Sequence, residues 1–276
     1  MYKRQGQYTA SIPATDFIRE DVVRIDHSFD SKFQLMGHYL HDAMAKSFYP
    51  PLWGDSSYPT VGTAMTNPSY TAAIKLTQTY TPTLLNETAF LYSGNKITLT
   101  PQAGKGGSFT YPNGWGTTSS GNPAASFFPL ADNDLSRMPA IFLQGAPLNT
   151  TWDPSYFPWK NGYEGFEYRD DLSWTKGRHQ FKFGPSLLHD YKNQQLQFNT
   201  NANAYFNSSN FTGDSYLNFL LGDASSFSQL QYLAGKHWVN NNFGAYANDN
   251  WHVSTRLTLN LGSVSYTHLD VYKRQG

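Results

Sequence analysis

The sequence contains no cysteine, so no disulfide can contribute to the fold, and only 14% of its residues are charged. Acidic and basic residues are equal in number, which gives no reason to expect a nucleic-acid partner. No stretch approaches the ~20 consecutive apolar residues of a membrane-spanning helix. Stretches rich in lysine, glutamate and alanine, which favour helices, are also missing. These absences argue against a disulfide scaffold, a helical membrane protein and a basic nucleic-acid binder.

Aromatic residues are abundant instead, at 16% of the chain. Glycine, proline, serine, threonine and asparagine are also plentiful between the aromatic stretches. Aromatic and β-branched residues favour strands, and the small polar residues favour turns and loops. The composition therefore predicts an all-β protein.

The stretch 166–191 shows the clearest pattern, because apolar and polar residues alternate along it with the period of a strand. A tight turn is predicted at Lys176-Gly177, which would place Leu172 opposite Phe181 and Asp171 opposite Lys182. One face of this hairpin would carry Phe166, Tyr168, Leu172, Trp174, Phe181, Phe183, Leu187 and Tyr191. The other face would carry Glu167, Arg169, Asp171, Ser173, Gln180 and Lys182.

Three further hairpins are predicted at 21–42, 71–93 and 241–262. Long polar connections are expected at 43–70, 94–165 and 192–236, the last holding an apolar patch at Tyr216–Leu221. Strands of ~10 residues with short turns on one side and long loops on the other are typical of outer-membrane barrels. We therefore predict an antiparallel hairpin meander of about eight strands, forming part of a large transmembrane β-barrel with long extracellular loops. The alternation does not decide which face Tyr246 takes.

A soluble or surface-anchored β-sandwich, acting in adhesion or carbohydrate binding, is the alternative. There the apolar face of each hairpin would pack on a second sheet instead of facing lipid.

Candidate functional residues follow from the barrel hypothesis, and the sequence predicts no enzyme, catalytic residue, cofactor or metal site. Polar residues expected to line the lumen are Lys75, Glu167, Arg169, Asp171 and Lys182. Tyr80, Trp174 and Trp251 each precede a short turn, where an aromatic girdle at the membrane interface is expected. Trp152, Tyr156 and Trp159 lie in a long loop and are candidates for ligand contact. Asp170 conflicts with this scheme, because strict alternation points its carboxylate toward lipid unless a bulge or a neighbouring partner intervenes.

The two ends of the chain share the pentapeptide Tyr-Lys-Arg-Gln-Gly, at residues 2–6 and 272–276. An exact repeat at both ends with none between is not how folding units duplicate. The tail 263–276 resembles translated sequencing-adapter sequence of the kind found at the ends of metagenomic fragments. We therefore expect residues 1–6 and 263–276 to be non-native and residues 7–262 to be a barrel fragment.

Five segments together resemble the TonB-dependent outer-membrane receptors, in particular Oar-like members with a carboxypeptidase-regulatory-like domain. They are REDVVRIDHSFDSKFQLMGHYLHD (19–42), TYTPTLLNETAFLYS (79–93), DDLSWTKGRHQFKFG (170–184), TGDSYLNFLLG (212–222) and AYANDNWHVSTRLTLNLG (245–262). They occur in the order found in that family, and the sequence departs from the family pattern after Gly262.

The resemblance implies a barrel of 22 strands, filled by a plug domain and energised from the inner membrane through a TonB box. Neither the plug nor the TonB box is seen in this sequence, so contact with the TonB complex would pass through a missing plug domain. The implied function is energised uptake of an unknown ligand that is too large or too scarce for a porin, such as a siderophore, a saccharide or a peptide. The implied location is the outer membrane of a Gram-negative bacterium, with membrane lipid as a partner.

Overall fold

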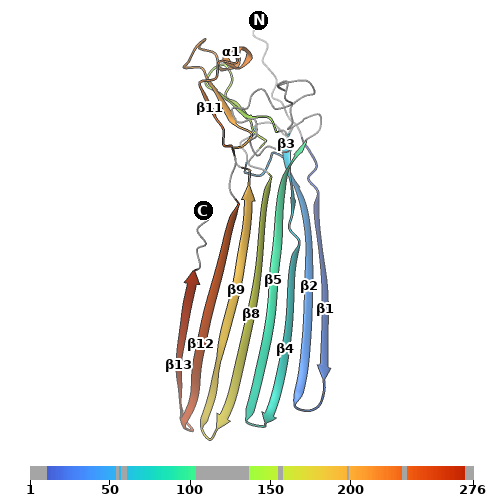
Figure 1. The fold of residues 1–276 in the computed structure, drawn as a ribbon, viewed down its shortest axis with the longest axis vertical. Helices are drawn as coiled ribbons and strands as arrows, with labels where there is room; N and C mark the ends of the chain where they lie inside the picture. Colours follow the sequence, from blue (N-terminus) through green and yellow to red (C-terminus); the bar gives the residue numbers. More distant parts are fainter. Residues whose placement is uncertain are drawn as a thin grey trace.

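The computed structural model describes residues 11–53, 56, 61–103, 137–154, 158–197, 199–231 and 235–270. Most of this part of the chain forms one long antiparallel sheet with the order β1-β2-β3-β5-β8-β9-β12-β13, in which β4 also pairs with β2 and β5 (Figure 1). Its strands are β1 Asp16–Ser28, β2 Phe33–Phe48, β3 Val61–Thr66, β4 Ser69–Thr81, β5 Leu84–Ala103, β8 Trp159–Lys176, β9 His179–Leu196, β12 Lys236–Ser254 and β13 Leu257–Asp270.

The nine strand segments of this sheet occupy eight strand positions. β3 and β4 share one position, because together they form a single strand that is interrupted at Asn67 and Pro68. Both segments pair with β2 on one side and with β5 on the other. Proline cannot donate a ladder hydrogen bond, which accounts for the break. The predicted meander of about eight antiparallel strands is therefore confirmed, and all four predicted hairpins are present.

The register of the central hairpin differs from the prediction. The loop consists of Gly177 and Arg178, so Lys176 ends β8 and pairs with His179. Gly177 has a φ of +62°, and turns of this kind place glycine at the first loop position. Leu172 therefore lies opposite Phe183 instead of Phe181, and Ser173 instead of Asp171 lies opposite Lys182. Because the register differs by two residues, every side chain keeps its predicted face.

The strands extend much further from the turns than the sequence predicted. β5 has 20 residues and β12 has 19, about twice the ~9–11 that a tilted strand needs to cross a bilayer. The expected loops 43–70, 94–165 and 192–236 are correspondingly shorter. The extension of β12 escaped prediction because Asn240, Asn241 and Asn242 place polar side chains on both faces, which removes the alternation. The extension of β5 does alternate, with Ile97 and Leu99 between Lys96, Thr98 and Thr100, and was wrongly assigned to the long polar loop.

A second, four-stranded sheet lies at the end of the molecule opposite the hairpin turns (Figure 1), in the order β11-β10-β6-β7. It consists of β6 Ala140–Gln144, β7 Thr150–Trp152, β10 Asn203–Asn207 and β11 Ser226–Ser228, and it packs with α1 Ser215–Leu221. Leu143, Ala204 and Phe206 form its core, against which Phe219 of α1 packs. The apolar patch predicted at Tyr216–Leu221 is thus a short helix, capped by the Asp214 side chain at its start and by Gly222 at its end. Among the described residues, no helix is both long and apolar enough to cross a membrane.

One face of the long sheet, which we call the apolar face, has no second layer on it in the described part of the chain. Each strand of the long sheet contacts only its neighbouring strands among the described helices and strands. Phe183 is 40% exposed, Leu187 46% and Phe243 48%. In a β-sandwich these three side chains would be buried against a second sheet. Their exposure therefore contradicts the sandwich alternative.

Strand β13 continues to Asp270, past the boundary predicted after Gly262. The register with β12 shows which residues of β13 lie on the apolar face. Before Gly262 these residues are Leu257, Leu259 and Leu261, and after it they are Ser263, Ser265 and Thr267. Val264 and Tyr266 take the opposite face and are exposed. The favourable alternation therefore stops at Gly262. The assignment of 263–276 as non-native stays a prediction, and residues 1–6 lie outside the described residues.

Candidate functional site on the polar face

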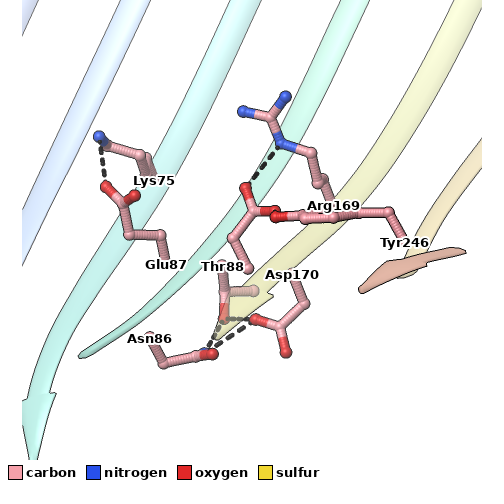
Figure 2. A network of polar contacts seen from close by, with 8 residues as sticks. Lys75, Asn86, Glu87, Thr88, Arg169, Asp170 and Tyr246 are labelled. Atoms are coloured by element: carbon pink, nitrogen blue, oxygen red, sulfur yellow. Dashed lines mark hydrogen bonds and ion pairs between the residues drawn. The ribbon is translucent and has the colours of Figure 1, made fainter. Parts of the chain in front are cut away.

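The polar face of the long sheet carries paired charges close to one another on β4, β5 and β8. Lys75 Nζ lies 2.9 Å from Glu87 Oε1, and Arg169 Nε lies 3.2 Å from Asp171 Oδ2 (Figure 2). Glu87 and Asp171 are direct cross-strand partners, so two like charges face one another. Such an arrangement is unfavourable alone, and here a cation from an adjacent position offsets each carboxylate.

Tyr246 completes this arrangement from two strands away. Its hydroxyl donates a hydrogen bond to Asp171 Oδ1, and β9 runs between the two residues. The β9 residue opposite Tyr246 is Gly184, which has no side chain to occupy the intervening space. A Cβ added to Gly184 would lie 1.8 Å from the Asp170 carbonyl oxygen, so the backbones also require glycine here. The face of Tyr246, which the sequence left open, is therefore the polar one.

The row of charges continues to the first strand. Arg24 Nε lies 2.7 Å from Asp26 Oδ2 on β1. Asp26 is opposite Met36 of β2, and Met36 is opposite Lys75, so Asp26 lies on the same polar face as Lys75. Arg24, two residues from Asp26 on the same strand, shares that face. We call the combined set the polar belt; it consists of Arg24, Asp26, Lys75, Glu87, Arg169, Asp171 and Tyr246. Its three cations and three carboxylates balance, and Asp171 is the most enclosed of its ion-pair partners, with 10% of its side chain exposed.

The register places all five predicted lumen residues on this one face. Lys75, Arg169 and Asp171 belong to the polar belt. Glu167 lies opposite Leu91, one pair further from the turns, and Lys182 lies opposite Ser173, nearer the turns and exposed to solvent. Their role in a lumen stays a prediction. Sequence reasoning missed Glu87, because the β5 stretch Leu84-Leu85-Asn86-Glu87-Thr88 does not alternate.

Asp170 lies on the apolar face, as strict alternation predicted, and neighbouring partners satisfy its carboxylate. Asp170 Oδ1 accepts hydrogen bonds from Asn86 Nδ2 at 2.8 Å and from Thr88 Oγ1 at 2.6 Å (Figure 2). Thr88 is directly opposite Asp170 on β5, and Asn86 is opposite Leu172, so it reaches Asp170 diagonally. Of the two possibilities predicted for Asp170, a bulge or a neighbouring partner, the structure shows the neighbouring partner.

The three aromatic candidates all lie near the hairpin turns. Trp174 and Trp251 point to the apolar face, Trp174 near the end of β8 and Trp251 near the end of β12. Tyr80 sits at a β-bulge near the end of β4, and its hydroxyl bonds to Gln78. Their placement at one end of the sheet fits an interfacial girdle, and that role stays a prediction.

The loop candidates are not gathered into one site. Trp152 ends β7 in the small sheet, opposite Ile141. Trp159 begins β8 in the long sheet, and its ring lies 5.2 Å from that of Trp53. Tyr156 is outside the described residues. The two tryptophans therefore belong to different sheets, and neither was predicted to be part of a strand.

Comparisons with known proteins agree with this architecture. The family model described as an outer membrane beta barrel domain matches residues 2–263. Among solved structures, the outer membrane transporter YddB from Escherichia coli is similar with a TM-score of 0.52 and 8% sequence identity. The match covers 92% of this chain and 28% of the transporter chain, so the two share a fold over part of the larger protein. A search of curated proteins gave no match.

Proposed function

Because this chain belongs to the family of outer-membrane β-barrel domains, we propose that it forms part of the barrel of a TonB-dependent receptor. In this proposal the apolar face contacts membrane lipid and the polar face encloses water. The whole receptor takes up a ligand that is too large or too scarce for a porin, at the expense of energy delivered from the inner membrane. The proposed ligand belongs to one of three classes, namely siderophores, saccharides or peptides.

The observation that carries the proposal is the polar belt. Its charges lie on the face opposite the exposed aromatic residues, and they extend from β1 to β12 at one level of the sheet. Charged groups in a transmembrane barrel belong on a hydrated inner surface, because a lipid-facing Arg or Lys is unfavourable by ~2–4 kcal/mol at mid-depth and a carboxylate by less. A balanced row of charges suits an inner wall that contacts a polar plug or a passing ligand.

Transport is supported by the resemblance of five segments to TonB-dependent receptors and by the shared fold with an outer membrane transporter. Contact with the TonB complex would be made by a plug domain of the complete protein. The residues proposed to face that plug or the transport path are Lys75, Glu167, Arg169, Asp171 and Lys182.

Uptake by whole cells tests this function. The complete gene is expressed in a Gram-negative host that lacks its own receptor for each probe, with and without the TonB complex. Radiolabelled ferric siderophores, oligosaccharides and peptides serve as probes. The proposal expects accumulation of one class only when TonB is present. Surface binding with no TonB-dependent accumulation, or equal accumulation without TonB, would contradict it.

A further inference from the structure

Two neighbouring hairpin turns, at 177–178 and 255–256, are joined into one rim. Arg178 Nη1 donates a hydrogen bond to the carbonyl oxygen of Val253 at 2.8 Å. The backbone N–H of His252 donates in return to the carbonyl oxygen of Arg178, also at 2.8 Å. The two turns are therefore held at a fixed spacing by a side-chain contact and a backbone contact.

This rim carries more positive charge than the carboxylate near it offsets. Lys176, Arg178 and Arg256 are all exposed. The one carboxylate at this level of β9 and β12 is Asp249, and His179 Nδ1 lies 2.7 Å from its Oδ2. Three cations against this one carboxylate leave a local excess of positive charge.

The other two hairpin turns of the described sheet lack such an excess. The turn between β1 and β2 contains Asp30 and Lys32, whose charges cancel. Asp30 Oδ1 also accepts the backbone N–H of Lys32 at 2.6 Å. The turn between β4 and β5, at residues 82–83, contains no charged residue. Positive charge is therefore concentrated on one side of the turn end.

Aromatic rings lie on the apolar face beside these cations. Lys176 Nζ lies 5.1 Å from the centre of the Trp174 ring. The His179 ring stacks between Phe181, at 5.4 Å, and Trp251, at 5.2 Å. Rings with an apolar body and a polar edge are favoured at the boundary between acyl chains and water, and cations just beyond them meet phosphate.

We propose that this rim, formed by Lys176, Arg178, Arg256, Trp174, His179 and Trp251, is a binding site for the headgroup of an anionic phospholipid. The short turns of outer-membrane barrels lie on the periplasmic side, so the lipid belongs to the periplasmic leaflet. The cations bind the phosphate, and the stacked rings contact the glycerol and the first methylenes of the acyl chains. The inference rests on the membrane orientation of the sheet and not on transport.

Native mass spectrometry of the complete protein in detergent tests the site. Phosphatidylglycerol and phosphatidylcholine with identical acyl chains are added at equal concentration, and the ratio of bound species is measured. The triple variant K176Q/R178Q/R256Q removes the excess charge. K32Q is the matched control, because it removes one cation from another turn of the same sheet. R178K/R256K keeps the charge and checks that the turns tolerate substitution.

The proposal expects the parent protein to retain phosphatidylglycerol preferentially, and the triple variant to lose at least about tenfold of that preference. K32Q and R178K/R256K keep the preference, and excess inorganic phosphate does not displace the lipid. An unchanged ratio in the triple variant would overturn the site. An equal loss in K32Q would overturn its location, and displacement by free phosphate would overturn the assignment to a lipid.

Discussion

Asp170 shows how a single ionisable residue is accommodated on the apolar face, which we propose contacts lipid. Its carboxylate is bound by the Asn86 amide and the Thr88 hydroxyl, both from the adjacent strand β5. Hydrogen bonds of this kind lower the free energy of a charged or polar group removed from water, and they satisfy their donors as well. The three side chains therefore form a unit, and changing one of them is expected to affect the other two.

We predict that D170A destabilises the complete protein by ~1–3 kcal/mol, because the Asn86 amide and the Thr88 hydroxyl lose the acceptor that they share. Replacing the whole unit, in N86L/T88V/D170L, is expected to restore or exceed the parental stability, since apolar side chains suit lipid. Urea unfolding in lipid vesicles measures both. A D170A variant as stable as the parent would show that the unit contributes nothing.

Gly184 is the second residue whose identity the structure explains. We predict that G184A loses ~1–3 kcal/mol of unfolding free energy, because the new methyl group would collide with the Asp170 carbonyl oxygen. G37A is the control, since a Cβ at position 37 has its nearest neighbour at 4.0 Å. Equal losses in the two variants would mean that the close approach at Gly184 is not the cause.

At the scale of elements, alternation located the hairpins, and turn chemistry set their register. The faces of 166–191 were predictable because each strand there alternates strictly, but the turn was placed one residue too early. Lys176 and Gly177 both suit a turn by composition, and only the positive φ of Gly177 distinguishes the first loop position. Most of the polar belt stands in alternating stretches, namely its three cations, Asp26 and Asp171, whereas Glu87 and Tyr246 do not.

The outer elements were the least predictable from sequence. The extension of β12 carries polar residues on both faces, so the alternation that identifies a strand is absent there. The extension of β5 alternates, but it is embedded in a stretch whose Gly and Pro content favoured a loop. Helix α1 is short, and Phe219 packs it on Phe206 of β10, a contact between residues that only the fold brings together. Asp214 and Gly222, its two caps, were the sequence signal that identifies this helix.

On the scale of the whole molecule, the long sheet dominates, and its outermost strands, β1 and β13, each have one neighbour in the described part of the chain. A sheet with two open edges and an uncovered apolar face has no stable arrangement in water. A barrel completed by further strands would remove both edges, and lipid would cover the apolar face.

We therefore predict that the 276-residue chain on its own aggregates in detergent-free buffer, and that the complete protein in detergent is a dispersed single species. Size-exclusion chromatography with light scattering distinguishes these states. A soluble, monodisperse monomer of the isolated chain without detergent would contradict the account at this scale.

The central claim is that the two faces of this sheet have different surroundings, lipid on one and water on the other. Because the chain contains no cysteine, single cysteines for a fluorophore can be placed along β9, on the apolar face at Phe183 and Leu187 and on the polar face at Lys182 and Ser186. With the complete protein in vesicles, and any cysteine outside these 276 residues replaced by serine, we expect brominated lipids to quench the probes at 183 and 187 and to leave those at 182 and 186 unquenched. Equal quenching at all four positions, or none at 183 and 187, would contradict the claim.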